Sequence, residues 1–223
     1  MGKDTVPRTA RRIPDASIRR LPAYLRALEA EAGQRLTSAA LGELTGFSSE
    51  QVRKDLAYFG AFGTRGVGYP AQDLASEIRH ILGLDRELKA ALFGAGHLGT
   101  ALARYVAATH RDVRIVAIFD PDPEKTGSEI AGTAVTSLVD LEGEVERLRV
   151  AVAILAVPEA AAEPLARRLA AAGVRGFLNF APVMLSLPPA ADDGPPVTIH
   201  NIDLSIELQT LAYFVQVHET ARV

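Results

Sequence analysis

The sequence predicts an α/β protein in which a small helical domain precedes a doubly wound parallel sheet. Two short helical patterns joined by a glycine-containing turn lie between residues 38 and 59. A glycine-rich turn, "FGAGHLG", comes after a short apolar run, and only after the first third of the chain. Apolar runs and helical patterns then alternate to the end, as expected for parallel strands joined by crossover helices.

Composition limits the possible classes of protein. The 223 residues are 48% apolar and 23% charged, which is typical of a folded globular protein. No apolar run approaches the roughly 18 residues of a membrane helix, and the basic N-terminus lacks the apolar core of a signal peptide. A cytoplasmic location without a membrane partner is expected. The absence of cysteine excludes disulfides, thiolate metal ligands and thiol redox chemistry, and no metal site is predicted.

Charge is distributed unevenly along the chain. Residues 1–65 carry 11 Lys/Arg against 7 Asp/Glu, whereas residues 66–223 carry 13 against 20. Basic surface attracts phosphate through Coulomb steering and counterion release. The basic front of the chain indicates a polyanionic partner, and charge scattered over a solvated surface is the alternative.

The first elements predict a helix-turn-helix. Residues 17–31, "SIRRLPAYLRALEAE", place apolar residues at helical spacing. Ser38 is suited to cap a short helix over residues 39–44, Gly46 to form a tight turn, and Ser48 or Ser49 to cap a second helix that ends near Phe59. Two short helices joined in this way are typical of DNA-binding proteins.

The second of these helices carries the candidate DNA-binding face. Its apolar positions predict the core, and the opposite face offers residue types that bond phosphates and base edges in a major groove. These are Ser48, Ser49, Gln51, Arg53, Lys54 and Tyr58. An isolated Arg-Lys pair is more often a solvated charge than a DNA contact, so the assignment depends on the residues after this helix.

A glycine-rich stretch, "FGAFGTRGVGY", comes directly after it. Phe62, Val67 and Tyr69 stand at strand-like positions and predict a short hairpin with Arg65 near its tip. A hairpin appended to a helix-turn-helix is a wing, and an arginine at its tip suits a narrow minor groove. A third helix over residues 73–83, capped by Asp73, closes a domain assigned to residues 1–84.

The turn after the first strand has the spacing of a dinucleotide-binding loop. Gly94, Gly96 and Gly99 form G-x-G-x-x-G between a buried strand over residues 88–93 and a helix. The first glycine permits the tight turn, the second lets backbone N–H groups approach a pyrophosphate, and the third lets helix and strand pack closely. We expect the loop residues Ala95, His97 and Leu98 to contact the nucleotide with them.

Asp120 completes this nucleotide pattern. It ends the second predicted strand, 21 residues after Gly99, where an acid can bind both ribose hydroxyls. A carboxylate there repels a 2'-phosphate, which favours NAD over NADP, although Lys125 weakens that exclusion slightly. Pro158 and residues 179–182 end later strands, where they either border the cofactor or simply terminate the strand.

The domain of residues 85–203 is followed by a terminal helix over residues 204–223. Apolar residues occupy two of its sides, namely Leu204, Leu208, Leu211, Ala212 and Val215 on one side and Ile206, Tyr213 and Phe214 on the other. A helix apolar on two sides needs two surfaces to pack on. A subunit interface and a helix covering its own sheet edge are both compatible with this pattern.

Six segments resemble, in order and spacing, the bacterial redox-sensing repressors of the Rex family. They are "QVRKDLAYFGAFGTRGVGYP", "GAGHLGTALARY", "IFDPDPEKTG", "AVPEAAAEPLA", "NFAPVML" and "NIDLSIELQTLAYF". The resemblance covers the chain from about Ser17 to Phe214. It implies a homodimer with an N-terminal winged helix, a C-terminal Rossmann domain and a last helix exchanged between subunits. It also implies that NADH and NAD+ are sensed ligands, and that a high NADH share releases pseudo-palindromic operator DNA.

The resemblance further implies a nucleotide-sensitive network of Arg26, Tyr105 and Asp203. Without it, the expected roles are a solvated charge, a core aromatic and a helix cap. His97 departs from the family, many of whose members carry Asn there. Because histidine changes its charge near neutral pH, the effect of His97 on nucleotide affinity stays open.

Two other classes compete with this interpretation. A dehydrogenase would need a proton donor and a substrate pocket over the nicotinamide, yet only about 140 residues come after the winged helix. One Rossmann domain consumes them, so no enzyme activity is predicted. A DNA-binding protein that binds another nucleotide, such as coenzyme A, is the third possibility, against which Asp120 argues for a free ribose diol.

Overall fold

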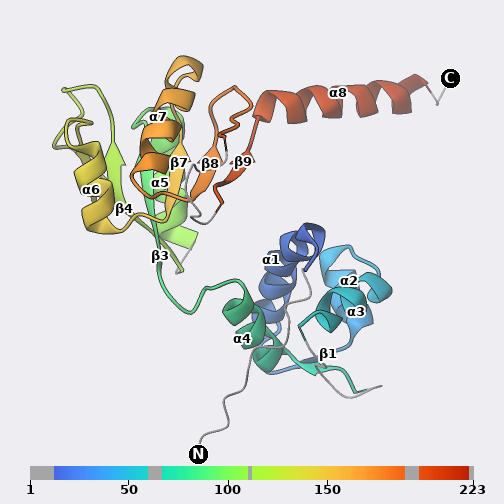
Figure 1. The fold of residues 1–223 in the computed structure, drawn as a ribbon. Coiled ribbons are helices and arrows are strands. Elements are labelled where there is room, and N and C mark those ends of the chain that lie inside the picture. The colour runs from blue at the N-terminus through green and yellow to red at the C-terminus, as the bar shows by residue number, and fades with distance from the viewer. Residues whose placement is uncertain (1–12, 60–66, 110–111, 189–195, 221–223) are drawn as a thin grey trace, which may run out of the picture. The chain divides into compact units, whose positions relative to one another are not determined.

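The computed structural model describes residues 13–59, 67–109, 112–188 and 196–220, with side chains up to residue 217. The chain divides into two compact units, Met1–Arg86 and Glu87–Val223. Figure 1 shows the elements of both units along the chain. Among the described residues, no helix combines the length and apolar character needed to cross a membrane.

The N-terminal unit is a helix-turn-helix packed on two further helices. It contains α1 (Asp15–Ala30), α2 (Ser38–Thr45), α3 (Ser49–Ala57) and α4 (Ala71–Ile81). Their apolar faces meet in one core, in which Leu21, Leu28, Leu41, Val52 and Ile78 are fully buried. Gly46 ends α2 with φ 76°, a left-handed conformation that glycine adopts without strain, so the predicted tight turn is confirmed.

Two predicted helix caps are wrong. Thr37, rather than Ser38, caps α2, because its hydroxyl accepts the N–H of Ala40 at 3.1 Å. Ser38 is the first helical residue, and its hydroxyl accepts a bond from the Arg53 guanidinium at 3.2 Å. Asp73 does not cap α4, because the helix already begins at Ala71, directly after Pro70. The N–H of Ala71 donates to Gln34 O. Asp73 instead lies in the first turn of α4, where the helix dipole stabilises a carboxylate.

The wing region is described only in part. Strand β2 (Tyr69–Pro70) pairs antiparallel with β1 (Arg35–Leu36), a short strand that the sequence did not reveal. Gly68, at φ 80°, precedes β2 and packs against the carbonyl of Leu36, where a Cβ would overlap backbone. Phe62 and Arg65 lie outside the described residues.

The C-terminal unit is a seven-stranded sheet in the order β5-β6-β4-β3-β7-β8-β9. Its strands are β3 (Leu88–Phe93), β4 (Val113–Phe119), β5 (Glu129–Ile130), β6 (Thr133–Thr136), β7 (Val152–Leu155), β8 (Gly176–Asn179) and β9 (Thr198–Asn201). All neighbours are parallel except β5 and β6. β3 is the first strand of the sheet along the chain and lies at its centre. β4, β6 and β5 lie on one side of β3, and β7, β8 and β9 lie on the other. This strand order is typical of a doubly wound nucleotide-binding sheet.

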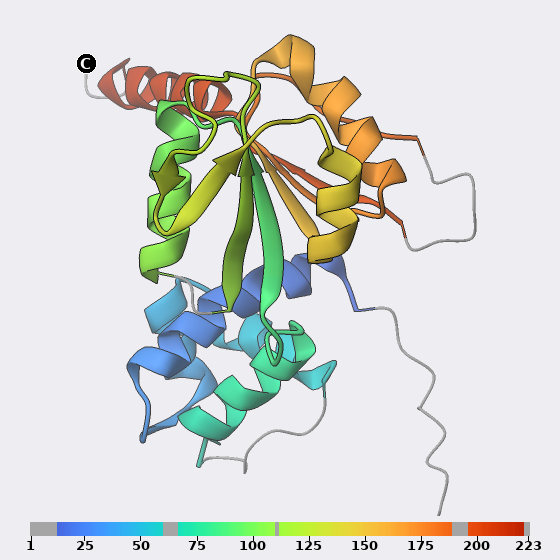
Figure 2. The same ribbon diagram turned by 90° about the vertical axis from the view of Figure 1, so that its left-hand side faces the viewer.

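Helices cover both faces of this sheet (Figure 2). α5 (His97–Thr109) packs on one face through Ala103, together with the partly buried Leu102 and Val106. α6 (Leu141–Leu148) and α7 (Glu159–Ala171) pack on the other, where Leu141, Val145 and Leu169 are buried.

The last helix, α8 (Leu204–Thr220), extends away from the sheet of its own unit (Figure 1). The large apolar side chains of both predicted sides are exposed, from 49% for Ile206 to 67% for Leu208. The alternative in which this helix covers the edge of its own sheet is therefore wrong for the single chain. Neither apolar side of α8 is buried against the described residues of its own unit.

Candidate nucleotide pocket and DNA-binding face

A pocket of roughly 740 Å³ opens at the carboxyl ends of the central strands. This is the crevice in which doubly wound sheets bind their ligands, at the point where the strand order reverses. The lining includes six predicted residues, namely Gly94, Gly96, His97, Leu98, Asp120 and Pro158, the last of which follows β7.

The three glycines of the turn lie in three different environments. At Gly94, with φ 97°, a Cβ would overlap the carbonyl of Ala156 in the strand end next to it. At Gly99 a Cβ would overlap the carbonyl of Gly94, so this glycine lets α5 approach the turn. At Gly96 a Cβ would meet nothing within 4 Å. Gly94 and Gly99 are thus required by packing, and Gly96 borders open space that a ligand can fill.

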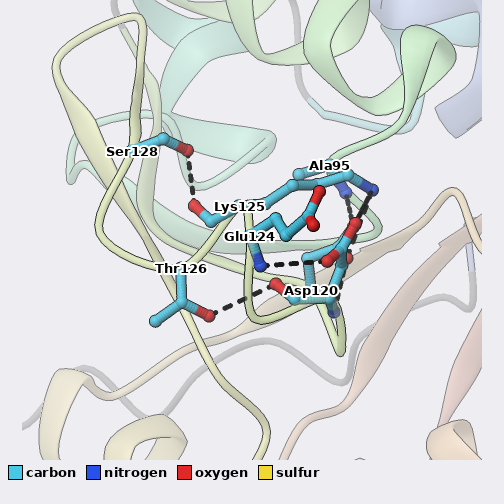
Figure 3. Close-up of polar contacts among 7 residues, drawn as sticks. Ala95, Asp120, Glu124, Lys125, Thr126 and Ser128 are labelled. Atoms are coloured by element: carbon cyan, nitrogen blue, oxygen red, sulfur yellow. Dashed lines mark hydrogen bonds and ion pairs between the residues drawn. The ribbon is translucent and has the colours of Figure 1, made fainter.

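Asp120 lies directly after β4 and is only 4% exposed (Figure 3). One carboxylate oxygen accepts the N–H of Ala95 at 2.6 Å and the other accepts the N–H of Asp122 at 2.9 Å. The Lys125 ammonium lies 3.3 Å from both oxygens. Burial alone would raise the pKa of Asp120, but these N–H groups and Lys125 lower it below its ordinary value. The carboxylate is therefore ionised, which strengthens the hydrogen bonds that it can accept from ribose hydroxyls.

The residues fit a nucleotide with a diphosphate and a free ribose diol. Two carboxylate oxygens have room for about four hydrogen bonds, and the backbone N–H groups use two of them. The N-terminus of α5 faces the open space beside Gly96, where the helix dipole favours an anion. Lys125 must share or leave the carboxylate when a ribose binds.

The lining also includes residues that the sequence did not point to. Arg168 of α7 reaches the pocket, and Glu142 of α6 holds its guanidinium in a bidentate pair at 2.7 and 3.0 Å. Leu138, Val157 and Leu165 add apolar wall. Since Glu142 and Arg168 are 26 residues apart, no local spacing rule could have joined them.

Of the residues predicted to border the cofactor at later strand ends, some line the pocket and others do not. Pro158 borders the pocket. Asn179 is fully buried, and its amide donates to Asn201 Oδ1 at 2.9 Å and to Val183 O at 2.8 Å. It lies outside the pocket lining and ties β8 to β9. Ala95 contributes its backbone N–H to Asp120, and Gly99 contributes packing.

The three residues of the implied network lie in separate elements. Tyr105 is on α5 and is 54% exposed, so the expectation of a core aromatic is wrong. Asp203 caps α8, because its Oδ1 accepts the N–H of Ser205 at 2.8 Å and that of Ile206 at 3.3 Å. Arg26 is an exposed residue of α1, in the N-terminal unit.

The candidate DNA-binding face lies on α3. Ser48 caps the helix by accepting the N–H of Gln51 at 3.1 Å, which resolves the choice between Ser48 and Ser49. Arg53 and Lys54 are exposed, and Tyr58 is partly buried at the end of the helix. The Gln51 side chain is not free, because its amide donates to the buried carboxylate of Asp55 at 2.9 Å.

A helix-turn-helix unit followed by a sheet with a nucleotide crevice defines the class of ligand-responsive DNA-binding regulators. Family models for a putative DNA-binding protein N-terminus and for a CoA binding domain match residues 12–57 and 85–183, respectively. The chain belongs to the Rex family of redox-sensing transcriptional repressors, since many members named so are about 40% identical to it.

The most informative relatives cover almost the whole chain. The Rex repressor of Natranaerobius thermophilus is 44% identical over 204 residues, which is 90% of each chain. That of Anoxybacillus flavithermus is 41% identical and covers 92% of this chain and 95% of its own. The structure of RSP, a Rex-family repressor, with NAD+ and operator DNA has a TM-score of 0.84 at 34% identity, covering 94% of this chain and 95% of its own. Its complex with NADH has a TM-score of 0.79 and covers 95% and 98%.

Proposed function

We propose that this protein is a transcriptional repressor that binds operator DNA through α3 and releases it when NADH occupies the pocket beside Gly96. The observation that carries the proposal is the ionised Asp120 at the rim of an open glycine turn, in a chain that also contains a helix-turn-helix. The relative RSP, solved with NAD+ and operator DNA and with NADH, supports both ligands. Relatives named as repressors support a regulatory role rather than an enzymatic one.

The proposed DNA contacts divide into two groups. Arg53 and Lys54 are cations on the exposed face of α3 and suit phosphate oxygens, together with Arg65 outside the described residues. Ser48, Ser49, Gln51 and Tyr58 offer neutral donors and acceptors that suit base edges and sugar-phosphate positions. The first group sets affinity and the second sets sequence preference.

A homodimer is part of the proposal. α8 exposes apolar side chains along its whole described length, and a stretch of this kind marks an interface in a protein free in solution. Exchange of α8 between two chains would cover both of its apolar sides. Two copies of α3 related by a two-fold axis then require a pseudo-palindromic operator with half-sites about one helical turn apart, or a multiple of it.

Release requires that NADH bind the DNA-incompetent arrangement more tightly than the competent one, since equal affinity shifts nothing. Coupling of about 1 to 3 kcal/mol is typical of allosteric sites. We assign Arg26, Tyr105 and Asp203 to the network that distinguishes the two arrangements. Their separate positions on α1, α5 and the start of α8 suit groups that meet only in one of them.

Coenzyme A is the second candidate ligand, because the family model that matches residues 85–183 is described as a CoA binding domain. The two ligands differ at the ribose. Coenzyme A carries a 3'-phosphate on its adenosine ribose, and a buried ionised carboxylate repels it, whereas the adenosine ribose of NADH is a free diol. Asp120 therefore favours NADH.

The test is a binding titration of the full-length protein. An operator is first isolated by selecting duplexes from a random pool with the protein itself, and its binding is then followed by fluorescence anisotropy. NADH is titrated at fixed NAD+, and NADPH and coenzyme A are titrated in parallel. Release by micromolar NADH alone is the expected result. Tight binding that no nucleotide changes would exclude redox sensing and leave only the DNA-binding role.

A further inference from the structure

Asp55 lies at the centre of a buried polar cluster that links α1 to α3. Its side chain is fully buried. The Arg20 guanidinium donates two bonds to its carboxylate, at 2.6 and 2.8 Å, and the Tyr24 hydroxyl donates one at 2.8 Å. A further bond comes from the Gln51 side-chain amide, one helical turn earlier on α3. The carboxylate is therefore saturated by donors from two helices.

The same cluster holds the turn between α2 and α3. The Phe47 ring packs edge-on against Tyr24, with the centroids 5.6 Å apart, and the Arg20 guanidinium lies 5.9 Å from the Phe47 centroid. A planar guanidinium that bonds a carboxylate through two nitrogens has little freedom to move. The position of Asp55 on α3 is thereby fixed relative to α1.

An ionised carboxylate can only accept hydrogen bonds. Burial alone would raise the pKa of Asp55, but the bonds from Arg20, Tyr24, Ser17 and Gln51 lower it to about 2, so it is ionised at neutral pH. A side-chain amide beside it must turn its NH2 group inward. The rotation that would place Oε1 against Asp55 is excluded by repulsion between two acceptors.

Gln51 is thus held in one of its two amide orientations. It is the third residue after the N-cap Ser48, a position from which glutamine commonly reaches back to the cap N–H. Here Nε2 reaches forward to Asp55 instead. Its amide keeps Oε1 and a second N–H for another partner, and Gln51 is only partly buried.

We infer that Asp55 is a positioning residue for sequence recognition, which fixes the Gln51 amide so that its Oε1 reads a base with an exocyclic amino group in the major groove. Adenine N6 and cytosine N4 are the two such groups, and adenine N7 would also accept the remaining N–H. Arg53 and Lys54 on the same helix present only donors, so they cannot accept from an amine. The inference rests on the proposed function in one respect, namely that α3 enters the major groove.

The first test changes Gln51 alone. Gln51→Met keeps the length of the side chain and removes both polar atoms. Binding of the full-length variant is measured on the selected operator and on duplexes with each base pair of the half-site substituted symmetrically. We expect discrimination at one base pair to fall about 10-fold, the order of a good side-chain to base contact, with the other positions unchanged. The pair that responds names the candidate base, which is adenine in an A·T pair and cytosine in a G·C pair. An unchanged specificity profile would overturn the inference.

The second test asks whether Asp55 acts through Gln51. Asp55→Asn can turn its own NH2 toward Gln51 and reverse the amide, so we expect it to lose discrimination at the same base pair. In the Gln51→Met background, Asp55→Asn should change discrimination at that pair no further. Uniform weakening at every position, with the base preference intact, would show a merely structural role and refute the inference. Thermal unfolding and NADH binding by the C-terminal unit serve as folding controls.

A third measurement uses only the wild-type protein and therefore does not depend on how Asp55→Asn folds. If the responding base is adenine, it is replaced by purine, which lacks the exocyclic amine; if it is cytosine, it is replaced by a pyrimidinone that lacks the same group. Binding should fall about 10-fold, as with Gln51→Met. Undiminished binding would contradict the orientation. Failure of the wild type to bind any selected duplex would instead count against the proposed function itself.

Discussion

The carboxylate of Asp120 and the backbone N–H of Ala95 form a 2.6 Å hydrogen bond across 25 residues of chain. This bond joins the end of β4 to the glycine turn after β3. The carboxylate proposed to bind the ribose is therefore hydrogen-bonded to the loop proposed to bind the pyrophosphate. A substitution of Asp120 should weaken binding of both the ribose and the pyrophosphate.

Asp120→Asn is expected to weaken NADH binding. The substitution keeps the shape of the side chain but removes the charge that strengthens its bonds to hydroxyl groups. Hydrogen bonds to charged groups contribute about 1.5 to 3 kcal/mol, so the dissociation constant should rise at least about 10-fold. The preference for NADH over NADPH should narrow as well. Titration of NADH fluorescence measures both effects, and Glu129→Gln on β5, outside the pocket lining, is the matched control.

The glycine turn allows a paired prediction. Gly96→Ala meets nothing within 4 Å, so it should leave the melting temperature unchanged while hindering the approach of a pyrophosphate. Gly99→Ala meets the carbonyl of Gly94, and overpacking of this kind costs about 1 to 3 kcal/mol of stability. Thermal unfolding and NADH titration should therefore separate the two variants. Equal melting temperatures for both would contradict the assigned packing role of Gly99.

Acid is expected to lower the free energy of unfolding of the N-terminal unit, because it protonates Asp55. Its pKa is about 2 in the folded protein against an ordinary value of 3.8. A lowered folded-state pKa gives stability that is present above pH ~4 and is lost as the pH falls from about 4 to 2, here about 2 kcal/mol. Hydrogen exchange in peptides from α1 and α3 should report this loss.

Two variants control the acid measurement. Asp55→Asn should remove this part of the pH dependence, because it leaves no carboxyl group to titrate at that position. Tyr24→Phe loses one donor but keeps the carboxylate, so a reduced dependence should persist. If Asp55→Asn kept the full wild-type pH dependence, the loss would have to come from other carboxylates.

Lys54 is expected to contribute phosphate contact without base preference. Lys54→Ala should weaken binding to all duplexes by a similar factor and reduce the slope of log affinity against log salt by about 1. Anisotropy titrations between low and physiological salt measure the slope. Arg147→Ala removes a cation from the C-terminal unit, where Arg147 pairs with Glu144, and should leave the slope unchanged. An unaltered slope for Lys54→Ala would remove Lys54 from the interface.

The apolar sides of α8 give a prediction on assembly. Leu208 is 67% exposed on the single chain, so a carboxylate placed there is harmless to a monomer and costly in a buried interface. Leu208→Asp should shift sedimentation from dimer to monomer at micromolar concentration and abolish operator binding. Gln209→Asp introduces the same charge at a neighbouring polar position and should remain dimeric. A Leu208→Asp dimer as stable as wild type would contradict the role given to α8.

The parts of the molecule that sequence could predict depend on local rules. The glycine turn, Asp120 at the end of the second strand and the Ser48 cap follow from spacings of a few residues around a strand or helix end. The two-sided apolar pattern of α8 is likewise a property of one helix. The same local reasoning was wrong at Ser38, because two adjacent hydroxyl residues compete and only Thr37 stands outside the helix.

The features that sequence could not predict depend on pairs distant along the chain. Arg20 and Asp55 are 35 residues apart, and each alone looks like a solvated helix charge. β1, β5 and β9 are two to four residues long and are defined by their partners rather than by their own periodicity. Arg168 lines the pocket, and its partner Glu142 lies on another helix, 26 residues away.

The exposed apolar surface of α8 also bears on inheritance. If two chains exchange this helix, as proposed, each chain pairs with whichever copy is made nearby, so two alleles in one cell would yield mixed dimers. A variant with an altered α3 and an intact α8 would then inactivate the wild-type chains with which it dimerises. Such a substitution in α3 should be dominant over the wild-type allele. A deletion of α8 should be recessive, because the variant chain cannot dimerise with wild-type chains.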